Sequence, residues 1–207
     1  MRRILVLAAT LLAIPCSASG QLDVTLNLGV HFDRLDQPHR LITTPDDQVF
    51  STRGEAPTIG LRTTYWLRSH LGVEAGFATS QNQSWEGGGL MPIPTMNKRT
   101  SFASLAAVWR PFDAARRVQP RLAVGPAVIL HSGSGESLLA RQWDLGVVGS
   151  AGVHLRVSKS VQLGFDLQNY RFSTDFKQYS SSGHTISRGE VIRRSEWLLL
   201  PAIRWTP

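Results

Sequence analysis

Nine ionisable residues fall at positions that could all face one enclosed polar surface. They are Asp23, His31, Arg62, Glu74, Asp144, His154, Arg156, Asp166 and Arg204. Each belongs to a segment in which polar and apolar residues alternate, and each falls on the polar side of that alternation. Carboxylates, guanidinium groups and imidazoles that share such a surface must pair, because an unpaired buried charge is costly. We therefore expect a structural network of ion pairs, in preference to a path for protons or ions.

Residue types that perform catalysis or bind metals are present, but their spacing supports neither role. The six histidines form no metal-ligand spacing. Ser132 follows His131, but adjacent residues of a strand point to opposite faces. The chain has no Gly-x-Ser-x-Gly elbow, and the glycine-rich stretches at 87–89 and 133–135 are not followed by a helix that would complete a phosphate cradle. We expect no cofactor, no metal and no enzymatic activity.

The first twenty residues have the layout of a secretory signal peptide. A basic start and an apolar stretch over residues 4–14 are followed by small residues at 17–20. We expect cleavage at that point, which leaves a signal peptide at 1–20 and a single domain at 21–207. The one cysteine, Cys16, follows a proline and fits a lipidation signal poorly, so the mature chain is expected to lack a thiol.

The mature chain is moderately basic. The whole sequence has 22 lysines and arginines against 15 aspartates and glutamates, and two of the arginines precede the apolar stretch of the signal peptide. This charge is either scattered over the surface or attracted to anionic lipid headgroups and lipopolysaccharide. Nucleic acid is not expected as a partner, because the chain is exported and has no basic run interleaved with stacking aromatic residues.

After residue 20, apolar residues recur at every second position, which is the pattern of β-strands. The alternation is clearest from Leu22 to Asp33. Eight segments are expected to form strands: 22–33, 57–67, 70–80, 99–110, 120–131, 142–157, 161–172 and 190–205. Most are long enough to cross a bilayer as tilted strands, which takes about 9–11 residues. The inner or outer face of 99–110 is ambiguous, and Leu198 and Leu200 interrupt the polar face of the last segment.

Long and short connections alternate between these segments. The short ones are at 68–70, 111–119 and 158–160, and the long ones are at 34–56, 81–98, 132–141 and 173–189. Membrane barrels sort their loops in this way, with short periplasmic turns and long extracellular loops. The sequence predicts an all-β, eight-stranded, antiparallel, up-and-down transmembrane β-barrel. Closure of the barrel should make Asp23 and Arg204 neighbours.

Aromatic residues cluster near the predicted strand ends, where girdles at the two membrane interfaces are expected. Those near the periplasmic ends are Tyr65, Trp66, Trp109, Phe112 and Trp205, and those toward the opposite ends are Phe32, Phe77, Trp143 and Phe172. Trp66 differs from the others because it falls on the inner phase of its strand. Eight strands enclose a lumen that side chains just fill, so a wide diffusion pore is not expected.

Three stretches carry a family resemblance. Residues 143–155 and 161–170 resemble the penultimate hairpin of small outer-membrane β-barrel domains, and 71–77 is similar to an early strand of the same group. The chain therefore resembles the OmpA/OmpX-like and porin-family barrels. The resemblance implies an outer-membrane location. It also implies that Trp205, although Thr206 and Pro207 follow it, is the aromatic assembly signal read by the barrel-assembly machinery.

The function expected from these observations is structural, or one of interaction through long extracellular loops, around a filled polar lumen. The expected partners are outer-membrane lipid and lipopolysaccharide and the assembly machinery, while the extracellular partner stays open. Two alternatives remain. One is a barrel enzyme that acts on lipid. The other is a soluble, lipocalin-like periplasmic binding barrel, whose interior would be apolar and whose exterior would be polar.

Overall fold

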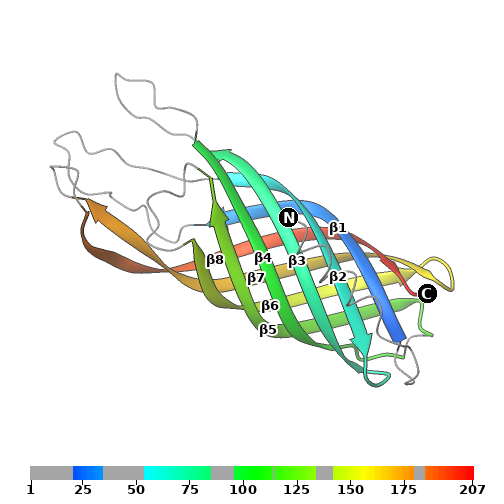
Figure 1. Ribbon diagram of the computed structural model, residues 1–207. Helices are drawn as coiled ribbons and strands as arrows, with labels where there is room; N and C mark the ends of the chain where they lie inside the picture. The colour runs from blue at the N-terminus through cyan, green and yellow to red at the C-terminus, as the bar shows by residue number, and fades with distance from the viewer. Residues whose placement is uncertain (1–20, 35–53, 85–95, 114, 134–141, 180–184) are drawn as a thin grey trace, which may run out of the picture.

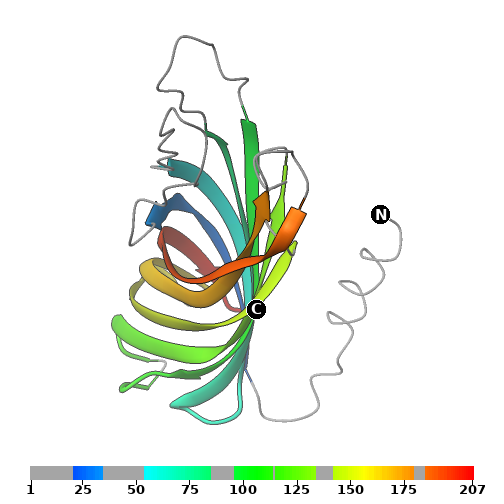
Figure 2. The same cartoon turned by 90° about the vertical axis from the view of Figure 1, so that its left-hand side faces the viewer.

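The protein forms a closed, all-antiparallel barrel of eight strands. The computed structural model describes residues 21–34, 54–84, 96–113, 115–133, 142–179 and 185–207. The strands are β1 (Gln21–Arg34), β2 (Gly54–Trp66), β3 (Leu71–Ser84), β4 (Met96–Trp109), β5 (Val118–Ser132), β6 (Trp143–Arg156), β7 (Val161–Tyr179) and β8 (Thr185–Trp205). Each strand pairs with the next, and β1 pairs with β8 from Val24–Trp205 to Arg34–Ser195, so the sheet has no free edge (Figure 1). The view in Figure 2 shows the strands wrapping around the enclosed interior.

This architecture confirms the fold predicted from the alternation of residues and loop lengths. The expected signal peptide at 1–20 lies outside the described residues. None of the described residues forms a helix of the length and apolarity that crossing a membrane requires.

The predicted loop at 173–189 is wrong, because β7 and β8 continue through most of it. They are 19 and 21 residues long and pair from Val161–Trp205 to Tyr179–Thr185. β6 accompanies β7 only as far as Phe172. Beyond that point the two strands project from the barrel as a ribbon, which we call the β7–β8 hairpin (Figure 1). Its register shifts between Asp175 and Lys177 and again between Gln178 and Tyr179, which interrupts the alternation of residues there.

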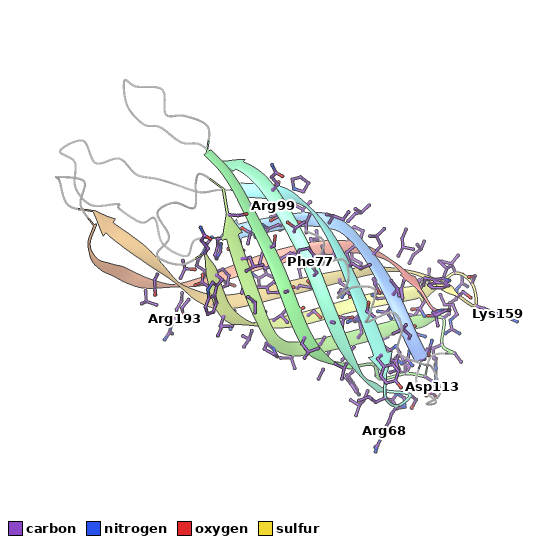
Figure 3. The ribbon with its side chains drawn as sticks, viewed as in Figure 1. Arg68, Phe77, Arg99, Asp113, Lys159 and Arg193 are labelled. Atoms are coloured by element: carbon purple, nitrogen blue, oxygen red, sulfur yellow. The ribbon has the colours of Figure 1, made fainter. Side chains whose placement is uncertain are left out.

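The outer wall is apolar and the inner wall is largely polar. Each strand exposes large apolar side chains outward, among them Leu26, Leu61, Phe77, Leu105, Val124, Val147, Phe165 and Ile203. Figure 3 shows charged side chains on both sides of this band: Arg68, Asp113 and Lys159 at the end with the short turns, Arg99 and Arg193 toward the other end. A lipocalin-like barrel would have the opposite polarity, so that alternative is wrong. The band is the surface that lipid chains solvate.

Two of the predicted girdle residues do not face lipid. Trp109, Phe112 and Trp205 are exposed on the outside at one end, as the girdle requires. Trp66 and Phe172 instead point into the lumen, where both are nearly fully buried. Strand alternation places each of them on the inner face, and proximity to a strand end does not override that alternation.

Candidate functional site

The inward side chains fill the lumen in layers, and β8 shows their order. From its C-terminal end upward, the inner positions of β8 carry Arg204, then Ala202, Leu200 and Leu198, then Glu196 and Arg194. Charged residues therefore lie on both sides of an apolar layer. We call these layers the central ion network, the apolar septum and the outer histidine layer, and their members are given below. The short turns mark the periplasmic end of the barrel, so the outer histidine layer is the extracellular one.

Asp23 anchors the periplasmic end of the lumen. Its carboxylate accepts hydrogen bonds from Trp66 Nε1 at 2.7 Å and from Thr206 Oγ1 at 2.6 Å. Arg204 Nη1 lies 4.0 Å from Asp23 Oδ2, so the two residues predicted to become neighbours on closure do so. The Arg110 guanidinium lies 3.8 Å from the centre of the Trp66 ring and stabilises this tryptophan inside the barrel.

Arg110 follows the last residue of β4 and covers this end of the lumen. Its Nε donates to the carbonyl oxygen of Ser69 at 2.6 Å. Burial lowers the pKa of Arg110 below its ordinary value, and the nearby Asp23 carboxylate opposes that shift. Arg156 lies half-buried at the end of β6, where its charge adds to the lowering of the Arg110 pKa. Arg156 is thus on the inner phase, as predicted, but at the rim.

The central ion network joins six residues from six strands. Its members are Arg62, Glu74, Arg121, His154, Asp166 and Arg204. Asp166 accepts a hydrogen bond from Arg62 Nη2, and its Oδ2 lies 3.0 Å from His154 Nε2. Glu74 Oε2 accepts from Arg121 Nη2 at 2.7 Å, while Glu74 Oε1 lies 3.5 Å from Arg62 Nη1.

The network is balanced in charge and held by polar neighbours. Its three arginines face three carboxylates when Asp23 is included. Thr64 donates to Glu74 at 2.7 Å, and Arg62 Nε donates to Asn27 Oδ1 at 2.9 Å. Every member is almost fully buried. Charges that are buried this deeply persist only when they are paired and hydrogen-bonded.

Five of the nine residues singled out in the sequence meet in this network, namely Arg62, Glu74, His154, Asp166 and Arg204. Sequence reasoning missed Arg121, which bridges toward both carboxylates and is 2% exposed. The inward position of Arg121 could have been predicted, because Arg121 lies two positions before Ala123 and therefore on the same, inner face of the strand. Glu196 was missed although it precedes the outward Trp197 by one position.

The apolar septum crosses the lumen above the network. Its members are Phe102, Ile129, Tyr170, Leu198 and Leu200, all at most 2% exposed. The Phe102 and Tyr170 rings lie 4.5 Å apart between centroids, and the Tyr170 hydroxyl donates to Gln168 Oε1 at 3.1 Å. This resolves the ambiguous face of the fourth segment, because Phe102 points inward. Leu198 and Leu200 interrupt the polar face because they complete the septum.

The outer histidine layer contains two imidazole–carboxylate pairs. His31 Nε2 lies 3.0 Å from Glu196 Oε2, and Arg194 Nη2 lies 2.9 Å from Glu196 Oε1. On the opposite strands, His131 Nε2 lies 3.0 Å from Asp144 Oδ2, to which Thr174 Oγ1 also donates at 2.6 Å. His31 and Asp144, two of the predicted residues, therefore take part in separate pairs and not in the central network. Within the described residues, no group of three or more His, Cys, Asp or Glu side chains could hold a metal ion.

In this layer, Ser80, His31 and Glu196 are connected in the serine–histidine–acid order of a hydrolase triad. Ser80 Oγ lies 2.8 Å from His31 Nδ1, and the other ring nitrogen faces Glu196. All three side chains are at most 3% exposed. Ser80 pairs with Thr58 on one side and Thr100 on the other, so the backbone around it is engaged in the sheet. An acyl-transfer site needs donors aimed at a developing oxyanion, and a fully paired backbone supplies none.

Two glycines give the central network its room. A Cβ atom on Gly164 would lie 2.6 Å from the His154 ring, and one on Gly152 would collide with the Asp166 carboxylate. Both residues sit on the inner face of β7 and β6. The lack of a side chain at these two points of the wall therefore leaves the space in which His154 and Asp166 approach each other.

Replacing Gly164 with alanine is expected to lower the free energy of unfolding by about 1–3 kcal/mol, because overpacking displaces the His154 ring. Gly149→Ala is the matched control, since a Cβ there meets nothing within 4 Å. Urea unfolding of both variants in phospholipid vesicles, followed by tryptophan fluorescence, measures the difference. Equal midpoints for the two variants would show that the network tolerates the methyl group.

Comparison with known proteins supplies the class of this barrel. No family model and no curated protein matches the sequence. Among solved structures, Neisserial surface protein A superposes with a TM-score of 0.59 at 12% identity, over 92% of this chain and 100% of that one. The fold is that of a small outer-membrane β-barrel. OprG from Pseudomonas aeruginosa gives a TM-score of 0.58 at 13% identity, over 89% and 95% of the two chains.

Outer membrane protein W of E. coli is a third similar barrel, with a TM-score of 0.51 at 16% identity over 92% of this chain and 100% of that one. Identities this low compare folds only. Together with the apolar outer wall, they confirm the resemblance to small outer-membrane barrels that the hairpin at 143–170 indicated. This outer-membrane barrel therefore spans its membrane with eight strands and turns its short connections to the periplasm.

Proposed function

We propose that this protein is a sealed, non-conducting barrel with a structural or interaction role at the cell surface, and that it is not an enzyme. The filled lumen carries the proposal. The septum and the central ion network both cross the interior, and their side chains are almost fully buried. A lumen sealed in this way would leave the outer wall and the extracellular end as the surfaces for a function.

The β7–β8 hairpin supports the interaction role. It extends past Phe172 and Ser195, the last residues that pair with β6 and β1, and so reaches beyond the closed part of the barrel. Membrane lipid and lipopolysaccharide are the expected contacts of the wall. The assembly machinery would read Trp205, which is exposed on the outer wall. A lower folded yield for Trp205→Ala than for Trp109→Ala, a tryptophan of similar exposure at the same rim, tests that role.

The first test is conductance. Purified full-length protein in planar lipid bilayers is expected to give no current steps above the leak of protein-free membranes, because side chains occlude the lumen. Heat-modifiable migration on gels, run on the same sample, verifies that the barrel is folded. Regular current steps from folded protein would overturn the proposal and make the lumen a pore.

The second candidate is a lipid hydrolase, favoured only by the contact between Ser80 and His31. Outer membranes from cells that express the wild type and Ser80→Ala would be extracted and their lipids compared by mass spectrometry. The proposed function requires identical acyl-chain patterns. A lipid species that loses one acyl chain with the wild type but not with the variant would establish the hydrolase instead.

A further inference from the structure

A polar hollow interrupts the apolar outer wall at the base of the β7–β8 hairpin. It has a volume of about 550 Å³. Its outward-facing lining comprises Leu145 and Val147 of β6, Arg171 and Ser173 of β7, and Arg193 and Ser195 of β8. Arg171 and Arg193 are both exposed. Figure 3 shows Arg193 pointing away from the wall where the hairpin leaves the barrel.

The two arginines are placed to hold one anion together. Arg171 pairs with Ser195 across the strands, and Ser173 pairs with Arg193, so the arginines are diagonal neighbours. Diagonal positions in a sheet are about 7–8 Å apart, within the joint reach of two long side chains. In the part of the chain that the structure describes, neither guanidinium forms an ion pair with a carboxylate. Asp175, the nearest acidic residue on this face of β7, is opposite Val191 and lies diagonal to Arg193 on the side away from Arg171.

Polar neighbours orient one of the guanidinium groups. Arg171 Nε donates to Asn169 Oδ1 at 3.0 Å, and Asn169 Nδ2 donates to Ser195 Oγ at 2.8 Å. These bonds engage Nε of Arg171 and leave the two terminal nitrogens of its guanidinium group for a ligand. A guanidinium fork presents paired donors that match phosphate oxygens.

The hollow also has an apolar side. Leu145 and Val147 are 66% and 54% exposed and continue the apolar band of β6 toward the membrane centre. A ligand that fits both sides carries an anionic headgroup and an acyl chain. The hollow lies toward the end with long connections, which is the extracellular end, so its lipid belongs to the outer leaflet. The hydroxyl groups of Ser173 and Ser195 suit sugar hydroxyls beside the phosphate.

We propose that Arg171 and Arg193 bind the phosphate of an outer-leaflet glycolipid of the lipid A class, with an acyl chain lying along Leu145 and Val147. The site is on the outer wall, so it is independent of the sealed lumen. Its failure and that of the proposed function are therefore separate results.

The test measures lipid binding to the full-length protein in detergent micelles by native mass spectrometry, with bisphosphorylated lipid A as the probe. Loss of a charge-assisted hydrogen bond weakens binding about tenfold, so the Arg171→Gln, Arg193→Gln double variant is expected to bind at least about tenfold more weakly. Arg99→Gln is the matched control, because Arg99 is an exposed arginine of β4 toward the same end and lies outside the hollow (Figure 3). Its affinity is expected to equal that of the wild type.

Three results would overturn the proposal. The first is equal affinity of the wild type and the double variant for lipid A. The second is undiminished binding of lipid A from which both phosphates have been removed. The third is equally tight binding of phosphatidylglycerol, which would assign the site to any anionic lipid. An Arg171→Lys, Arg193→Lys variant keeps both charges without the fork. It is expected to bind with intermediate affinity, and it stands in for the glutamine variant if that one does not fold.

Discussion

Replacing Asp166 with asparagine is expected to lower the free energy of unfolding of the barrel by about 3–5 kcal/mol, the cost of removing one partner from a buried ion pair. Asp166 is fully buried and accepts from Arg62, with His154 at 3.0 Å and Arg121 Nε at 3.9 Å from its oxygens. The asparagine keeps the shape but leaves Arg62 and Arg121 with only Glu74 to balance them. The midpoint of urea unfolding in phospholipid vesicles measures the loss.

Two further variants show whether the loss comes from the network. Asp113→Asn removes a carboxylate whose side chain is 71% exposed, and it is expected to leave the midpoint unchanged. An Arg62→Gln, Asp166→Asn double variant is expected to be more stable than the sum of the two single losses predicts, because contacting residues couple by about 0.5–3 kcal/mol. Additive losses, or an Asp166→Asn barrel as stable as the wild type, would mean that the pair contributes nothing to folding.

Strand alternation predicted which residues enter the lumen but not which of them meet there. The phase of each segment placed Arg62 and Asp166 on the inner wall, and the structure agrees. Their contact joins β2 to β7 across the interior, so it depends on the tilt and stagger of the strands. The Asp23–Arg204 contact could be predicted because closure makes β1 and β8 neighbours in the ladder.

Two of the features that sequence reasoning missed, the septum and the projecting hairpin, lie where alternation disappears. Leu198 and Leu200 are inward while Leu199 is outward, so the apolar run carries no period that separates lumen from lipid. In the β7–β8 hairpin the alternation is interrupted because the register shifts near Asp175. The septum and the projecting hairpin can therefore be recognised only once the pairing of the neighbouring strands is known.

Replacing Phe102 with alanine is expected to destabilise the barrel by about 3–5 kcal/mol, as for other buried Phe-to-Ala changes. The Phe102 ring is fully buried, and its centroid lies 4.5 Å from that of Tyr170 and 5.2 Å from that of His31. Phe77→Ala is the matched control. Phe77 belongs to the neighbouring strand but is 49% exposed on the outer wall, so its loss should cost much less (Figure 3).

The same pair of variants distinguishes the two layers that could seal the lumen. If the septum is the seal, Phe102→Ala will pass ions in planar bilayers while Phe77→Ala and the wild type will not. The charged network beneath would then conduct once water reaches it, because paired guanidinium and carboxylate groups can exchange partners with water and ions. If Phe102→Ala folds, as judged by heat-modifiable migration, and still passes no ions, the septum is not the sole seal. The ion pairs around Asp166 would then close the barrel by themselves, and Asp166→Asn should open it.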